Sequence, residues 1–468
     1  MTRRIVINPI TRMSGFMELD VTVEGGVVTE AKTKGTMFRG FEQMMVGRSP
    51  FDAIYLTQRI CGICSTAHSV GASLALEDAL GVVPTEQGRY LRDVIHASEF
   101  LQNHIRHFYQ YGVPDYVRIP KLNTIYDSEH NDFRLPSSVN DRIAAHYFDS
   151  LPISRLAHEL LATFGGKAPH NHGVFVGGYS TPASVDQLVR AKSILKQISL
   201  FTNEKLISDA YLLAKYYPDY FQIGQGHGNL MSYGIFFDYS ELGTLYVKPG
   251  LYQHGSYLPF DPDKITEYHD QSWYIGNSPN RPLESMPEPD MEKPNAYSWV
   301  KAPRYDGLPF EVGPLARLWL SGNYRNGIST MDRTLARALE VKKVIEVIEV
   351  LLDQIIPGTA VQKRWDVPDQ AMGSGLTDTT RGALGHWLKI EEKKLSFYQI
   401  ITPSGWDFSA STSINKGTAE QALLGTQIAD PDHPVELGRI LRSFDPCMSC
   451  ATHVHRPGHP SKTFQVFG

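Results

Sequence analysis

The chain contains four cysteines, and all of them belong to two Cys-x-x-Cys pairs near its opposite ends. Cys61 and Cys64 lie in RICGICSTAH, and Cys447 and Cys450 lie in DPCMSCATH. Two thiols in this spacing can bind one metal ion or form one disulfide. The residue types therefore indicate metal or redox chemistry that draws on both ends of the chain.

Three chemistries compete for these thiols. A structural zinc site uses four thiolates, but its two pairs normally lie about 15–20 residues apart. A dithiol redox motif needs one pair in a thioredoxin-like βαβ unit, which neither flank supplies. The third is a four-thiolate site for a softer, redox-active metal such as nickel or iron, for which a large scaffold must bring the chain ends together. The third interpretation is specific only if the residues that flank the cysteines support it.

Those flanks resemble a known family. The pattern Arg-x-Cys-Gly-x-Cys followed by His68, and the pattern Asp-Pro-Cys-x-x-Cys-x-x-His near the C terminus, are similar to the large, catalytic subunit of [NiFe] hydrogenases. The resemblance continues through GTMFRGFE, GGKAPHNHGVFVGG, TRGALGHW, ITPSGW and GTAEQALLGT, which occur in the family order. It covers the chain from end to end apart from a Tyr/Pro-rich middle, at about 216–315.

The resemblance implies a bimetallic centre. Cys61 and Cys447 would be terminal nickel thiolates, whereas Cys64 and Cys450 would bridge nickel to an iron that carries one carbonyl and two cyanide ligands. An open metal site that polarises H₂, with a nearby base for the proton, suits a substrate that is barely polar.

Roles for the surrounding side chains follow from the same resemblance. Arg381 would lie over the open side of the cluster, and Asp445 would either orient it or cap a helix. Ser404 would hydrogen-bond a cyanide, His68 would donate to a cluster sulfur, and the thiolate of Cys447 could take the first proton.

A second metal ion, magnesium or iron, is implied away from the cluster. Glu42, His453 and the backbone carbonyl of Ile400 match its ligands in the family. This site would tie the C terminus into the core.

Three positions depart from the family pattern. Ser14 stands where the family usually has a glutamate that relays protons, and a hydroxyl cannot hold a proton near neutral pH as a carboxylate does. Asn103 stands where some relatives have an aspartate near the arginine. Thr379 and Thr380 replace the usual Ala-Pro before Arg381.

The expected activity is the reversible, heterolytic oxidation of H₂. Iron–sulfur clusters need about four cysteines each, and the resemblance commits every cysteine here to nickel, so a separate small subunit must carry the clusters. A maturation endopeptidase would remove the tail 454–468 after His453. The alternatives are an H₂-sensing regulatory hydrogenase of the same family and a complex I relative, which lacks the nickel thiolates.

Composition narrows the class of partner. The 468 residues include 45 basic and 50 acidic ones, with a net charge of −5 and no long run of one sign, which argues against nucleic acid. No stretch reaches the roughly 18–20 apolar residues of a membrane span. Similarity to respiratory uptake enzymes favours the outer, periplasmic face of a membrane, reached through the partner subunit, with a cytoplasmic location as the alternative.

The elements that must position these residues are mostly helical, with a small sheet and a strand-rich segment in addition. The expected fold class is therefore α+β, organised as one domain over residues 1–468. Apolar periodicity predicts a long helix over 91–111, which places Asn103 and His107 on one face. Two further helices are predicted, one over 184–215, following Thr181 and Pro182, and one over 334–355. Residues 4–9, 17–23 and 27–33 predict a small N-terminal antiparallel sheet. The segment 216–315 predicts short strands and ordered loops.

Overall fold

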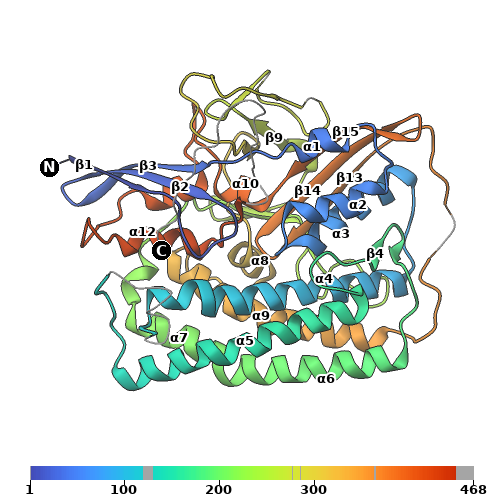
Figure 1. Ribbon diagram of the computed structural model, residues 1–468, viewed down its shortest axis with the longest axis horizontal. Coiled ribbons are helices and arrows are strands. Elements are labelled where there is room, and N and C mark those ends of the chain that lie inside the picture. The colour runs from blue at the N-terminus through green and yellow to red at the C-terminus, as the bar shows by residue number, and fades with distance from the viewer. Residues whose placement is uncertain (1, 120–129, 277, 285, 363–364, 449–468) are drawn as a thin grey trace, which may run out of the picture.

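Four long helices form one layer of the molecule. The computed structural model describes residues 2–119, 130–276, 278–284, 286–362 and 365–448. Helix α4 contacts both α5 and α9, and α6 contacts α5 and α9 in turn. Figure 1 shows α4, α5 and α6 lying side by side in the lower half of the molecule. Their bounds are α4 Glu86–Arg106, α5 Ser137–Gly165, α6 Val185–Phe201 and α9 Thr330–Gln354.

Helix α4 confirms the prediction of a long helix and starts earlier than the periodicity indicated. Thr85 caps its N terminus by accepting a hydrogen bond from the amide of Gly88. After Arg106 the helix continues as a wider π-helical turn, His107–Gly112. Asn103 and His107 are both buried, so the expected functional face of this helix points into the protein.

The two other predicted helices are also present, with one correction. Helix α6 does not begin after Thr181 and Pro182, because Ser184 and Gln187 form a capping box directly before Val185. The block then passes through a π-helical turn, Thr202–Leu206, into α7, Ile207–Tyr216. Helix α9 begins after a second capping box, formed by Ser329 and Asp332.

Two long helices were not predicted. Helix α3, Ser65–Leu80, is built from small residues and is buried on almost every side, so it lacks an apolar stripe to detect. Helix α5 contains Pro152, which normally signals a break.

The N-terminal sheet is antiparallel with the order β1-β2-β3, as predicted. Its strands are β1 Thr2–Ile7, β2 Met17–Glu24 and β3 Val27–Gly35. Alternate residues of β2 from Met17 to Val23 are buried in a core shared with α11 (Thr418–Leu423) and α12 (Val435–Ser443). This shared core brings the two ends of the chain together.

A second antiparallel sheet, β13-β14-β15, packs on α3. Its strands are β13 Gln370–Thr379, β14 Gly382–Glu391 and β15 Lys394–Ile401. Gly373 and Gly375 face the helix backbone so closely that a Cβ at either position would overlap it. The sequence analysis did not predict this sheet.

Short strands and loops occupy the Tyr/Pro-rich segment, as predicted. Its strands pair locally in small sheets above the helical layer (Figure 1). They are β6 Leu230–Ser232, β7 Gly250–Gln253, β8 Ser256–Leu258, β9 Ile265–Tyr268, β10 Tyr274–Ile275, β11 Glu288–Pro289 and β12 Ala302–Tyr305. The remaining elements are α1 Phe41–Met45, α2 Asp52–Leu56, β4 Val174–Phe175, β5 Gly178–Tyr179, α8 Pro314–Ser321 and α10 Pro403–Asp407.

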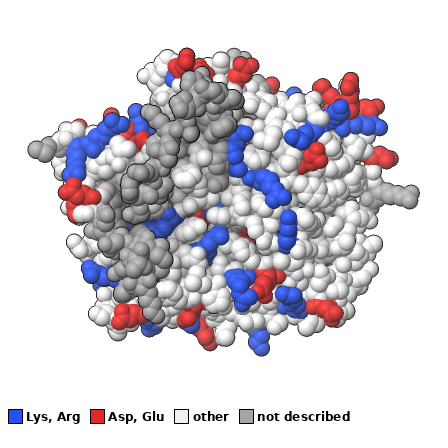
Figure 2. All heavy atoms as spheres, in the orientation of Figure 1, with Lys and Arg blue, Asp and Glu red and all other residues white. Residues whose placement is uncertain are grey.

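Charges of both signs are interspersed over the face drawn in Figure 2. Among the helices of the described residues, none is both long enough and apolar enough to cross a membrane.

A buried ion network joins the helical layer to the second sheet. Arg317 of α8 pairs with Glu340 of α9 at 2.7 Å and with Asp378 of β13 at 3.1 Å, and all three side chains are fully buried. Its guanidinium also donates to the carbonyl oxygens of Thr379 and Thr380. Arg317 therefore fixes the end of β13.

We predict that Arg317→Met lowers the free energy of unfolding by about 3–5 kcal/mol, because it leaves buried carboxylates without their cation. Chemical denaturation measures the change. Lys192→Met is the matched control: its ion pair with Asp353 is largely exposed, so a change of less than about 1 kcal/mol is expected. Equal effects of the two variants would contradict a stabilising role for the network.

Candidate metal centre

Three of the four cysteines meet in the interior. The Sγ atoms of Cys61, Cys64 and Cys447 all lie within 4.8 Å of one another and are buried. The Sγ atoms of Cys61 and Cys447 are 3.3 Å apart. Cys450 lies outside the described residues. The structure thus confirms that residues from both ends of the chain form one thiol site.

A short backbone pairing holds the two ends together. The amide of Ser14 donates to the carbonyl of Pro446 at 3.3 Å, and the amide of Met448 donates to the carbonyl of Ser14 at 2.7 Å. Ser14 Oγ also lies 3.8 Å from Cys61 Sγ. The segment around Ser14 therefore touches thiol residues of both pairs.

The turn after α12 aims Cys447 at the site. Asp445 has φ of 61°, a left-handed conformation that aspartate tolerates better than most residues. Ser404 then accepts a hydrogen bond at 3.0 Å from the amide of Cys447. That bond uses an oxygen lone pair, which leaves the Ser404 hydroxyl hydrogen for another acceptor.

Arg381 lies at the turn between β13 and β14. Its Nε donates to the carbonyl of Asp445 at 2.9 Å and lies 3.1 Å from Oδ1 of the same residue. Its Nη2 donates to Oδ1 of Asn103 at 2.9 Å, and Nδ2 of Asn103 donates to Oδ2 of Asp445 at 2.7 Å. The three side chains form a closed, buried triangle, in which Asp445 orients Arg381.

The residue before the turn adds a further bond. The amide of Arg381 donates to Oγ1 of Thr379 at 3.0 Å. An alanine, the family's usual residue two positions before the arginine, has no such acceptor. The departure at Thr379 thus supports the same arginine.

Both charges of the triangle are stabilised in place. Burial alone would lower the pKa of Arg381, but Asp445 and the cysteines outweigh it and raise the pKa well above its usual value. Burial alone would raise the pKa of Asp445, but Arg381, His107 and Arg337 lower it below its usual range. Arg381 Nη1 has no hydrogen-bond partner in the part of the chain that the structure describes.

His68 lies in a chain of side chains that the sequence analysis did not foresee. Its Nδ1 is 3.1 Å from Nε2 of His386, and Nδ1 of His386 is 2.7 Å from the hydroxyl of Tyr398. Burial lowers the pKa of His68 to about 4, so the ring is neutral near pH 7. Only the motif TRGALGHW, which contains His386, could have drawn attention to it.

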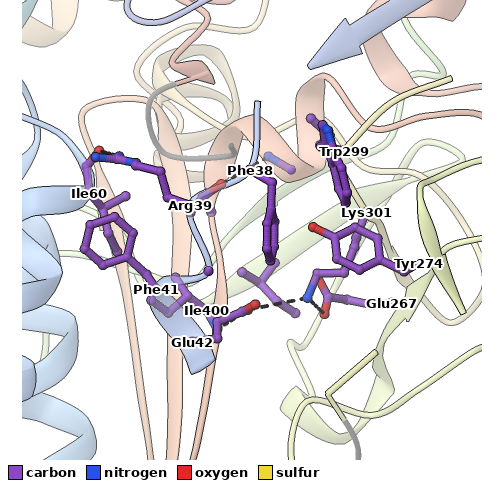
Figure 3. Close-up of a pocket in the computed structure, with 15 residues that line it drawn as sticks. Phe38, Arg39, Phe41, Glu42, Ile60, Glu267, Tyr274, Trp299, Lys301 and Ile400 are labelled. Atoms are coloured by element: carbon purple, nitrogen blue, oxygen red, sulfur yellow. Dashed lines mark hydrogen bonds and ion pairs between the residues drawn. The ribbon is translucent and has the colours of Figure 1, made fainter. Parts of the chain in front are cut away.

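Two of the three predicted ligands of the second metal lie together. Glu42 Oε1 accepts a hydrogen bond from the amide of Ile400 at 3.1 Å. Figure 3 shows both residues on a cavity wall, with Lys301 between Glu42 and Glu267. Lys301 Nζ lies 3.4 Å from Oε1 of Glu42 and 3.0 Å from Oε2 of Glu267. His453 lies outside the described residues. The sequence analysis missed Lys301 and Glu267.

The donor atoms fit the metals that the sequence implies. The three buried sulfurs lie close enough together to bind one ion, which suits a soft metal. The buried guanidinium of Arg381, with an unused N–H at Nη1, suits a centre that carries negative charge. A carboxylate in a cavity, as at Glu42, is the donor type that Mg²⁺ prefers.

Comparison with known proteins agrees with this geometry. The family described as nickel-dependent hydrogenase matches residues 39–129, 120–327 and 320–453. The chain belongs to this family. It is the catalytic large subunit of a [NiFe] or [NiFeSe] hydrogenase, an oxidoreductase that oxidises H₂, and a large subunit implies a small-subunit partner.

Two relatives and one solved structure illustrate the similarity. The chain is 35% identical to the periplasmic [NiFeSe] hydrogenase large subunit of Desulfomicrobium baculatum, over 96% of this chain and 95% of that protein. It is 30% identical to the hydrogenase-2 large chain of Escherichia coli K12, over 97% and 98%. A Ni-Fe-Se hydrogenase structure from D. vulgaris Hildenborough superposes with a TM-score of 0.93 at 36% identity, over 97% of this chain and 100% of that one. The names of the first and third include selenium, whereas the present sequence has cysteine at all four positions.

We predict that Arg381→Lys keeps the metals but lowers H₂-dependent dye reduction roughly a hundredfold, because a compact ammonium cannot contact Asp445, Asn103 and the thiol side together. Arg155→Lys, on the exposed face of α5, is the control and should leave turnover unchanged. Metal analysis accompanies both assays. Full turnover in Arg381→Lys would remove this guanidinium from the chemistry.

Proposed function

We propose that the subunit splits H₂ heterolytically at a nickel–iron centre held by Cys61, Cys64, Cys447 and Cys450. Cys64 and Cys450 would hold both metals, and the iron would carry one carbonyl and two cyanide ligands. The observation that carries the proposal is the meeting of three buried thiols with the Arg381–Asp445–Asn103 triangle.

The bound metals supply an open coordination position that polarises H₂. Around it, the thiolate of Cys447 accepts the proton released from H₂. Arg381, held by Asp445 and Asn103, directs a positive N–H edge towards the site, where a dry environment strengthens its effect on developing charge. Ser404 uses its remaining hydroxyl hydrogen to bind a cyanide.

His68 is proposed to donate to a cluster sulfur. Its Nδ1 is engaged with His386, so this donation uses Nε2. The neutral ring and the fixed second nitrogen support the role, since the partner of one nitrogen sets which proton the other carries.

The electrons from H₂ pass to iron–sulfur clusters in the small subunit, which would also determine the location of the complex. We further propose that the whole chain acts as one large-subunit unit, with its second metal, Mg²⁺ or Fe²⁺, bound by Glu42, the carbonyl of Ile400 and His453. The pairing of Glu42 with Ile400 supports this site.

We predict that Cys64→Ser lowers the nickel content of the purified complex at least roughly tenfold and abolishes H₂ oxidation, because a hydroxyl is a poor ligand for a soft metal. Ser73→Ala is the control and should retain both, because it alters a buried serine of α3, the helix that follows Cys64, whose Oγ has no partner among the described residues. Infrared bands of bound carbonyl and cyanide test the iron ligands in the same samples. Normal nickel and turnover in Cys64→Ser would refute the assignment.

The tail gives a separate test. If an endopeptidase acts after metal insertion, intact-mass measurement of active enzyme will find a chain that ends at His453, since removal of 454–468 lets the C terminus fold over the finished cluster. An active, nickel-loaded chain that still carries Gly468 would overturn this part of the proposal.

A further inference from the structure

Helix α3 begins directly at a thiol of the site. Cys64 occupies its N-cap position, where Ser, Thr, Asp or Asn commonly accepts a hydrogen bond from the first backbone amides. The side chain of Cys64 makes no such capping bond. The first turn of α3 is buried, and an unsatisfied buried N–H is costly. Another residue therefore has to accept from these amides.

Glu99 of α4 supplies the cap. Its Oε1 accepts a hydrogen bond from the amide of Thr66 at 2.7 Å, and its Oε2 accepts one from the amide of Ala67 at 3.0 Å. These are the second and third residues of α3, whose amides an N-cap side chain normally binds. Glu99 is only 2% exposed, so water does not compete for the two bonds.

The cap does not depend on the charge of Glu99. Burial raises the pKa of Glu99 to about 8, and the amides of Thr66 and Ala67 oppose the increase. A neutral carboxyl group keeps a lone pair on each oxygen, so both protonation states can accept from the two amides. The reach and shape of the side chain therefore decide whether the cap forms.

The same turn is bound by the loop between α5 and β4. The amide of His170 donates to Oγ of Ser65 at 3.0 Å, and Nδ2 of Asn171 donates to Oγ1 of Thr66 at 3.4 Å. Each of the three residues that follow Cys64 is thus bonded to another element of the fold. The backbone next to Cys64 is held from outside the helix.

This external support matters because the helix holds its own first turn weakly. The carbonyl of Cys64 accepts from the amide of His68 at 3.4 Å, which is long for a backbone hydrogen bond. Cys64 is joined to the turn by a single peptide bond, so a shift of the turn would move its sulfur. Glu99 opposes such a shift with two shorter bonds.

We propose that Glu99 is a positioning residue of the metal centre: by capping α3 in place of Cys64, it sets the direction in which Cys64 presents its sulfur to the metals. The inference rests on the proposed function, in which Cys64 would hold both metals. Ligands of a metal site need such support, because the site tolerates only small errors in their direction.

Two variants of the complete complex test this role. Glu99→Ala removes both acceptors. Glu99→Gln keeps the volume of the side chain but accepts only one of the two bonds, since its NH₂ group is a donor. Nickel content, turnover per nickel and the infrared bands of bound carbonyl and cyanide are measured for each. The bands report the electron density at iron, which depends on how the shared thiolate binds.

We expect turnover per nickel to fall roughly tenfold in Glu99→Ala and by a smaller factor in Glu99→Gln. The infrared bands should shift from their parent positions in the same order. Glu99→Gln retains one capping bond and leaves no cavity, so it assembles even if Glu99→Ala does not, and its bands then decide the question.

Thr85→Ala separates positioning from stability. Thr85 caps α4 by accepting from the amide of Gly88 at 3.0 Å, and α4 carries none of the thiols. Loss of this cap should lower the thermal stability of the complex, as loss of the α3 cap does. The infrared bands and turnover per nickel should stay at the parent values.

Parent-like bands and turnover per nickel in the Glu99 variants would overturn the proposal. Equal changes in Thr85→Ala would also overturn it, because the effect would then follow from lost stability alone. A parent complex that lacks nickel, or lacks the carbonyl and cyanide bands, would contradict the proposed function itself rather than the role of Glu99.

Discussion

The pairing of the chain's two ends around buried thiols is the constraint on which the rest of the structure depends. Cys447 lies 3.3 Å from Cys61, and Ser14 helps to hold it there by binding the backbone on both sides of Cys447. Closing so long a loop costs conformational entropy, which grows only slowly with its length. The core shared by the N-terminal sheet, α11 and α12 offsets that cost with apolar burial. Ser14 is thus a structural residue of the centre, whatever its part in proton transfer.

A second requirement is to hold cations in a dry interior beside the thiols. Arg381 is compensated by Asp445, and Arg317 by Glu340 and Asp378. The two arginines are linked through the backbone, because Arg317 binds the carbonyls of Thr379 and Thr380, directly before Arg381. The ion network therefore contributes to precision at the site as well as to stability, since the turn that carries Arg381 cannot shift without breaking buried bonds.

Sequence patterns predicted the parts of this structure that carry a local signature. The Cys-x-x-Cys motifs located the thiols, and apolar periodicity located α4 and α9. Helix α3 was not predicted because a helix that is buried on all sides has no polar face to reveal its period. The sheet β13–β15 was not predicted because its key residues are glycines, and their role is visible only when the sheet is packed against α3. The contacts His68–His386 and Glu42–Lys301 were not predicted for another reason. Each joins residues far apart in the chain, and single side chains without a motif give no sign of their partners.

The two departures nearest the triangle have a common electrostatic effect. An amide at position 103 donates to Asp445 and accepts from Arg381 at once, which a carboxylate could do only when protonated. The triangle therefore keeps one positive and one negative charge, and Asp445 needs no proton of its own to stay bound. Serine at position 14 likewise removes a carboxylate from the thiol side. With ionisable groups withdrawn from both positions, Asp445 Oδ1 is left facing Arg381 and His107.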